Sequence, residues 1–78
     1  MKAILKQTLG FSRQKGFPFY DFVLHKGDII EVTKLYTEKH SLWSCWCIRI
    51  LYNNKKYWCV YDYNTVYPVP CPIILLEN

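Results

Sequence analysis

The sequence of 78 residues has only two histidines, six acidic residues and three glycines. The acidic residues are scattered, so no pair of carboxylates indicates acid–base catalysis. His25 falls in a turn and His40 in a polar connector, and local geometry places no serine or cysteine side chain beside either imidazole. No glycine-rich phosphate loop is present. We therefore expect a protein that is not an enzyme, with no catalytic residues and no cofactor.

Long apolar runs are also absent. No run reaches the roughly 18 residues that a transmembrane helix needs. The apolar start Ala3-Ile4-Leu5 is interrupted by Lys6, so no secretory signal is predicted. We expect no membrane association and a cytoplasmic location, which for a viral protein means the host cytoplasm. In that reducing compartment the four cysteines should be thiols.

Strand-forming residues dominate what is present. Apolar residues make up 51% of the chain and aromatic residues 18%, enough for a dense small core. No window sustains a helical period over three turns. The composition therefore predicts one all-β domain over residues 1–78, with a core of about 2–69 and a proline-containing C-terminal tail over 70–78.

Strands and turns alternate along the chain. A strand is expected over residues 2–9 and a loop over 10–18. An arm over 17–24 would then return and fold back onto a second strand over 28–36. A polar connector follows over 37–41. A hairpin follows over 42–63, with its turn at Asn53-Asn54-Lys55-Lys56. Residues 63–69 would supply a 3₁₀ turn and a closing strand. The apolar run 72–76 would form a last strand or a packed tail.

The hairpin has two faces of opposite character. Trp46, Ile48, Ile50 and Cys59 share one face, which we assign to the core. The opposite face carries the charged residues Arg49, Lys56 and Asp62 and is therefore predicted to be the outer one. It also carries Trp43, Trp58, Cys45 and Cys47.

The segment Phe22–Thr33 resembles a motif of the SH3-like small β-barrels. It combines an apolar arm, a Lys26-Gly27-Asp28 turn and a β-branched strand, as the diverging turn and second strand of that family do. The resemblance implies a small barrel of about five strands with a long RT-type loop. From the family's peptide groove it carries over Trp43 and, second, Tyr67. The other peptide-groove motifs are largely absent, which implies a use other than ordinary proline-rich peptide recognition.

The cysteines Cys45, Cys47, Cys59 and Cys71 raise the question of a metal site. Residues two apart on a strand lie about 7 Å apart, which is wide for one tetrahedral ion. Cys59 has the opposite parity, and no Cys-x₂-Cys knuckle is present. We therefore expect no metal site.

Two binding functions remain. The preferred partner is a protein or peptide, recognised by aromatic anchors: Tyr20, Trp43, Trp58, Tyr63 and Tyr67. The same rings could instead cap the open ends of a small barrel. Small barrels of this kind look like accessory proteins of phages or other mobile elements, so a host protein is the expected target. A homodimer is compatible with an exposed aromatic face.

The alternative partner is a nucleic acid. Residues 1–26 carry five basic residues and one acidic residue, which accounts for the whole net charge of +4. Lys2, Lys6, Arg13 and Lys15 would contact phosphates while aromatic rings stack on bases. This charge could instead serve solubility. A basic region that shares a face with the aromatic residues would favour nucleic acid, and opposite faces would favour protein.

Overall fold

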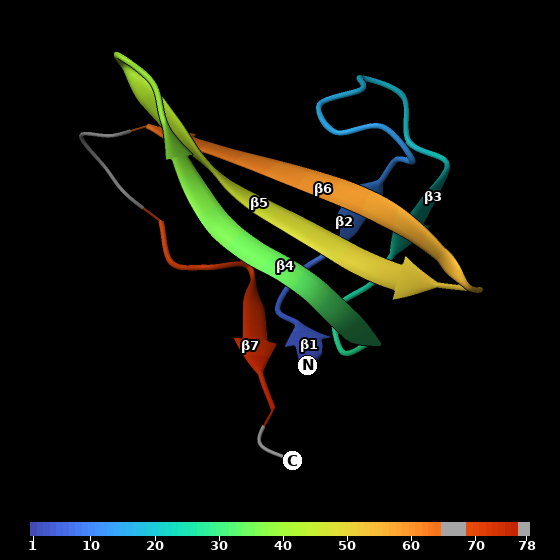
Figure 1. The fold of residues 1–78 in the computed structure, drawn as a ribbon. Helices are drawn as coiled ribbons and strands as arrows, with labels where there is room; N and C mark the ends of the chain where they lie inside the picture. Colours follow the sequence, from blue (N-terminus) through green and yellow to red (C-terminus); the bar gives the residue numbers. More distant parts are fainter. Residues whose placement is uncertain (65–68, 77–78) are drawn as a thin grey trace.

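The computed structural model describes residues 1–64 and 69–76, and this part of the chain is built of strands, turns and loops (Figure 1). The strands are β1 (Lys2–Leu5), β2 (Leu9–Phe11), β3 (Phe22–Leu24), β4 (Ile29–Lys39), β5 (Trp43–Tyr52), β6 (Lys55–Asn64) and β7 (Ile73–Leu75). The predicted all-β class is confirmed. None of the described residues forms a helix long and apolar enough to cross a membrane.

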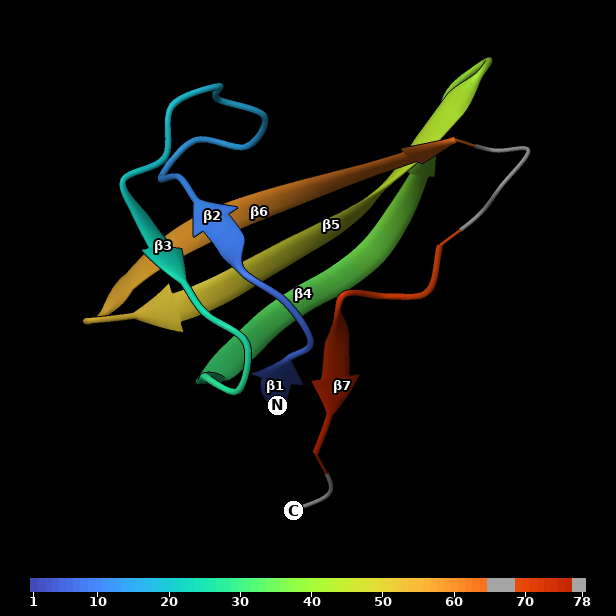
Figure 2. The ribbon, with the colours of Figure 1, turned by 180° about the vertical axis from the view of Figure 1, so that it is seen from behind.

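The strands form two antiparallel sheets. The large sheet has five strands in the order β6-β5-β4-β1-β7, and the small sheet pairs β2 with β3. Ser12, just after β2, joins the two sheets by a bridge to Trp58, whose amide donates to the Ser12 carbonyl at 2.6 Å. Figure 2 shows β2 and β3 lying across one face of the long strands. Over residues 1–64 and 69–76 the strands do not close into a barrel.

The core lies between the small sheet and the large one. Its buried members come from six strands: Ala3, Leu5, Leu9, Phe11, Ile30, Val32, Ile48, Ile50, Cys59 and Ile73. The prediction that Ile48, Ile50 and Cys59 face inward is confirmed. Trp46 is only half-buried, because it lies beyond the small sheet, and its indole N–H donates to the Val69 carbonyl at 3.3 Å.

The β5–β6 hairpin is the element that the sequence predicts best. Asn53 and Asn54 have φ values of 50° and 63°, and Tyr52 pairs directly with Lys55. Two consecutive residues with positive φ make a type I′ turn, whose twist matches that of the flanking strands. The hairpin turn is thus confirmed, and it consists of Asn53 and Asn54 alone because Lys55 and Lys56 belong to β6. The predicted polar connector over 37–41 is shorter, because β4 continues to Lys39.

The turn at Gly27 is present, but it joins different partners from those predicted. Gly27 has a φ of 94°, and the Asp28 carboxylate accepts the His25 amide at 2.8 Å. The expected arm does not fold back onto the following strand, since β3 pairs with β2. The physical reason is that β1 already occupies that edge of β4, and Leu5 exchanges backbone hydrogen bonds with the turn.

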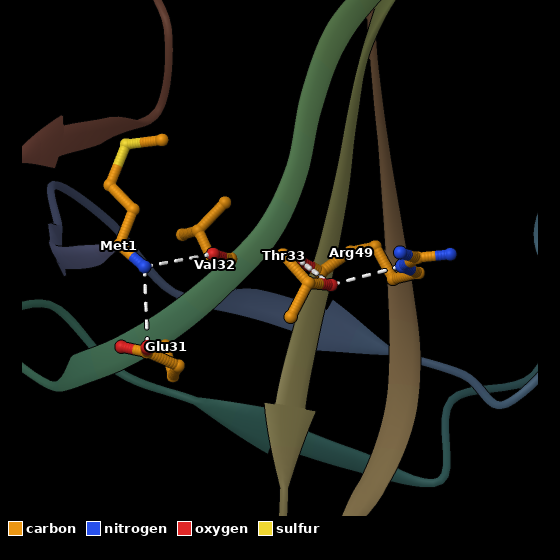
Figure 3. Close-up of polar contacts among 5 residues, drawn as sticks. All are labelled: Met1, Glu31, Val32, Thr33 and Arg49. Carbon is orange, nitrogen blue, oxygen red and sulfur yellow. Dashed lines mark hydrogen bonds and ion pairs between the residues drawn. The ribbon is translucent and has the colours of Figure 1, made fainter.

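A bulge at Thr33 interrupts the register between β4 and β5. The Thr33 hydroxyl donates to the Arg49 carbonyl at 3.2 Å and accepts from Arg49 Nε at 2.9 Å (Figure 3). Beside it, the Met1 ammonium group contacts the Glu31 carboxylate and the Val32 carbonyl, each at 3.2 Å. A bulge increases the local twist of a strand, so it helps β4 to curve around the core.

The C-terminal run forms the last strand rather than a packed tail. β7 pairs with β1, and Pro72 and Ile73 are buried. The hydrophobic side chain of Ile73 therefore contributes to the core. The 3₁₀ turn and closing strand predicted over 63–69 fall largely on residues 65–68, which lie outside the described residues.

Candidate functional site

The loop over residues 12–21 between β2 and β3 is held at its base by hydrogen bonds. The buried Ser12 hydroxyl donates to the Phe19 carbonyl at 2.8 Å. The Asp21 carboxylate accepts the Arg13 amide at 2.8 Å, and the Asp21 amide donates to the Phe11 carbonyl at 2.8 Å. These contacts across the loop fix its two arms and leave its tip to project.

Aromatic side chains project from that tip. Phe17, Phe19 and Tyr20 are all exposed, and 73% of Phe19 is accessible to solvent. The rings of Phe17 and Phe19 meet edge to face with their centroids 5.7 Å apart. Exposed aromatic residues that cluster on a well-anchored loop are typical of interaction surfaces.

A pocket of about 180 Å³ opens between the loop and β6. Its walls combine apolar rings with one carboxylate, and the lining residues are Ser12, Gly16, Phe17, Pro18, Tyr20, Trp58, Val60 and Asp62. The predicted site residues Tyr20 and Trp58 are thus brought together, from positions far apart in the sequence. The pocket is sized for a single side chain rather than for a large ligand.

Gly10 positions one wall of this pocket. A Cβ atom at residue 10 would collide with the Tyr20 ring, which lies directly over the glycine. We expect Gly10→Ala to displace Tyr20 and to cost about 1–3 kcal/mol in the free energy of unfolding, as overpacking does. Denaturant unfolding measures this loss of stability. Gly16→Ala is an unsuitable control, because Gly16 has a φ of 77°, which strains any residue with a side chain. The matched control is Val23→Ala on the exposed side of β3. Equal stabilities of the two variants would contradict this role.

Lys15 folds back from the loop onto the large sheet. Its ammonium group forms an ion pair with Glu38 and lies 5.2 Å and 5.6 Å from the ring centroids of Tyr36 and Trp58. A side-chain hydrogen bond with Tyr36 raises the pKa of Lys15 above its ordinary value. This cation is therefore engaged within the molecule, and it ties the loop to β4.

The other basic residues named for nucleic-acid binding lie apart from one another. The Arg13 guanidinium is 5.4 Å from the Tyr57 ring centroid. Lys2 begins β1 and Lys6 follows it, and both views show β1 at the opposite end of the molecule from the 12–21 loop (Figures 1 and 2). The structure does not bring these four cations into one patch.

The remaining predicted aromatic anchors are also dispersed. Trp43 is about six strand positions from Trp58, roughly 20 Å, and stacks on His40 at a centroid distance of 4.1 Å. Tyr63 is half-buried beside Trp46, on the other face of the hairpin from Trp43. Tyr67 lies outside the described residues. Of the predicted anchors among the described residues, only Tyr20 and Trp58 therefore share a site.

The hairpin face predicted to be outward is partly buried. Cys45 is 2% exposed and Cys47 0%, so the expectation that both thiols lie on an open surface is wrong. The reason is that Lys15, Tyr36 and Trp58 pack together over this face. The Sγ atoms of Cys45 and Cys47 are 3.6 Å apart, much closer than the 7 Å expected from strand spacing. All four cysteines are free.

Burial of Cys59 predicts a loss of stability in alkali. Burial raises the pKa of Cys59 to about 12 from an ordinary value of 9.0. The neutral thiol is favoured in the folded protein, so its contribution is complete below pH 9.0 and is lost as the pH rises to about 12. We expect Cys59→Val to lose stability less steeply than the wild type over this range, measured by urea unfolding at several pH values. Parallel curves would contradict the expectation.

Phe17 and Phe19 were not among the predicted site residues, although the sequence contains a pattern that indicates their exposure. The run Gly16-Phe17-Pro18-Phe19-Tyr20 puts large apolar residues inside a segment that Gly and Pro mark as a loop. Side chains in such a loop have no strand face that directs them to the core, so they were candidates for an exposed surface. The closeness of Glu38 to His40 was not predicted either, because it depends on the tertiary fold.

Comparisons with protein-family models, with curated proteins and with solved structures find no match to this chain.

Proposed function

We propose that this chain is a small SH3-like interaction module that binds a protein partner. The observation that carries the proposal is the cluster of Phe17, Phe19 and Tyr20, exposed at the tip of an anchored loop and adjoining the pocket. Aromatic residues of this kind dominate the binding energy of protein interfaces, because they bury large areas at little cost in side-chain entropy.

The order of elements supports the SH3-like part of the proposal. The chain runs in order through a first strand, a long loop, a glycine turn, a long strand, a hairpin and a closing strand. The Ser12–Trp58 bridge joins the small sheet to the free edge of β6. These features fit a partly open small barrel with an RT-type loop.

The pocket favours a basic side chain from the partner. Asp62 supplies a carboxylate at a pocket whose walls include Tyr20 and Trp58. A lysine or arginine inserted there would pair with the carboxylate and lie against the Tyr20 ring, since aromatic rings attract cations and Trp58 already has Lys15 and Arg49 beside it. The partner segment would place its apolar residues against Phe17 and Phe19.

Selection from a random peptide library tests this proposal. The wild-type protein, a Phe17→Ser/Phe19→Ser double variant and a Leu42→Ser control serve as parallel baits. Leu42 is 78% exposed in the turn between β4 and β5, so its replacement removes an exposed apolar side chain outside the 12–21 loop. Peptides rich in lysine or arginine should be enriched on the wild type and the control but not on the double variant. Equal enrichment on all three baits would contradict the proposal.

The nucleic-acid alternative receives less support from the charges. Lys15 is engaged by Glu38, Arg13 lies over Tyr57, and β1 lies at the other end of the molecule. We expect single- and double-stranded DNA to leave the tryptophan fluorescence unchanged even at low salt. Quenching that weakens steeply as salt rises would reverse the choice, since it reports several phosphate contacts. That the partner is a host protein of a phage or mobile element stays a prediction.

A further inference from the structure

Metal-ligating side chains converge where β4 turns into β5. Glu38 lies near the end of β4, His40 in the turn, and Cys45 on β5 directly opposite Glu38. One ligand atom from each of the three lies within 4.8 Å of the other two. The closest approach of His40 to Glu38 is 3.8 Å, between Nε2 and Oε2. A carboxylate, an imidazole and a thiol therefore surround one point.

A further thiol, that of Cys47, lies next to Cys45 but outside this group of three. The Sγ atom of Cys47 is 3.6 Å from that of Cys45, and both side chains are buried. The two thiols point to the same side of β5 because they are two residues apart. Their closeness reverses the reasoning from strand spacing, which placed them too far apart to share an ion.

We propose that Glu38, His40, Cys45 and Cys47 form a binding site for a zinc ion. Two thiolates, an imidazole and a carboxylate are all ligands that zinc accepts, and the pair of thiolates disfavours magnesium and calcium. Zinc carries no geometric preference of its own, so the side chains can set a tetrahedral arrangement. This inference goes beyond the proposed binding function and does not depend on it.

Two distances in the cluster can be compared with those of such a centre. With Zn–S bonds of about 2.3 Å and Zn–N and Zn–O bonds of about 2.0–2.1 Å, tetrahedral ligand atoms lie roughly 3.3–3.8 Å apart. A pair of sulfur ligands is expected at about 3.8 Å and a nitrogen–oxygen pair at about 3.3 Å. The sulfur–sulfur distance of 3.6 Å is close to the first value, whereas the 3.8 Å between His40 Nε2 and Glu38 Oε2 exceeds the second by about 0.5 Å. Binding of the ion would therefore require the His40 and Glu38 side chains to move closer together.

Lys15 completes the balance of charge. It pairs with Oε1 of Glu38, while Oε2 of the same carboxylate faces His40. Two thiolates and one carboxylate carry three negative charges, which Zn²⁺ and the Lys15 ammonium neutralise together. Oε1 can keep Lys15 as its partner while Oε2 binds the ion, an arrangement in which a neighbouring group orients a ligand.

His40 is held in place by the turn itself. Its backbone amide donates to the Trp43 carbonyl at 2.8 Å, and its ring stacks on the Trp43 indole. The imidazole is thus oriented before any ion binds. This stacking also provides a fluorescence signal, because an ion on His40 lies close to Trp43.

Titration of the full-length, reduced protein with Co²⁺ under anaerobic conditions tests the site. Cobalt is a visible probe of zinc sites. We expect one Co²⁺ per chain, with the intense visible bands of tetrahedral cobalt, a near-ultraviolet thiolate-to-cobalt charge-transfer band, and quenching of Trp43. Zinc should displace the cobalt and remove the bands. Weak octahedral cobalt bands without charge transfer would overturn the proposal.

Variants separate this site from adventitious binding. We expect His40→Asn and Glu38→Gln to weaken cobalt binding by about tenfold or more each, and Cys45→Ser to remove much of the charge-transfer band. His40 is exposed, so its variant should fold even if a cysteine variant does not. Cys71→Ser, which alters a thiol outside the cluster, is the matched control and should bind cobalt as the wild type does. Equal binding by His40→Asn and the wild type, or a loss of binding in Cys71→Ser, would overturn the assignment.

Discussion

Replacement of Phe11 by alanine is expected to remove a large fraction of the protein's free energy of unfolding. Phe11 is fully buried and stacks on Phe22 with ring centroids 5.6 Å apart, between the small sheet and the large one. Truncation of a buried phenylalanine costs about 3–5 kcal/mol, since it removes apolar contacts and leaves a cavity. A domain of this length has a total stability of roughly 4–12 kcal/mol, so the loss is a large fraction of it.

Urea unfolding followed by circular dichroism measures this effect. The control is Val23→Ala, because Val23 lies on the partner strand β3 but is exposed, and its truncation should cost well under about 1 kcal/mol. A loss below about 1 kcal/mol for Phe11→Ala would mean that the small sheet does not complete the core.

The second large effect is expected in binding rather than in folding. Phe19 is the most exposed aromatic residue of the loop tip and contributes nothing to the core. We expect Phe19→Ser to weaken the binding of a selected peptide by about thirtyfold or more, the loss typical of a central interface residue. The free energy of unfolding should change by less than about 0.5 kcal/mol.

Isothermal titration calorimetry with the same peptide measures this change in affinity. Leu42→Ser removes a side chain of similar exposure from the β4–β5 turn and should bind as tightly as the wild type. Similar losses in the two variants would show that general surface hydrophobicity, not the loop, drives the association.

Local sequence patterns predicted the elements whose geometry is local. Asn53 and Asn54 specify their turn because Asn tolerates positive φ, and the parity of the flanking strands then places Ile48 and Ile50 in the core. Gly27 specifies its turn in the same way. Such features depend on a few adjacent residues, so the sequence alone carries them.

Contacts between distant segments could not be predicted from local sequence patterns. Parity correctly placed Cys45 and Cys47 on the face opposite the core, but it carries no information about what covers that face. The cover comes from Lys15, thirty residues before Cys45, which contacts Tyr36 and Trp58. The pairing of β3 with β2 likewise depended on which strand occupied the edge of β4.

In the candidate sites, too, single residues could be predicted from the sequence but their contacts with distant residues could not. Tyr20 and Trp58 were both predicted as binding residues, yet only the folded chain shows that they line one pocket while Trp43 lies elsewhere. The cluster of Glu38 with Cys45 arises from the register between β4 and β5. Spacing along a single strand, which was the basis for excluding a metal, ignores how the side chains lean toward one another.

The central proposal is that the 12–21 loop and the adjoining pocket receive a protein segment. Amide chemical-shift mapping tests it most directly: a selected peptide is titrated into the ¹⁵N-labelled protein. The largest shifts should fall on residues 14–20 and on 58–62 of β6, around Phe19 and Asp62. Shifts concentrated in β1, or in the turn around Leu42, would contradict the proposal.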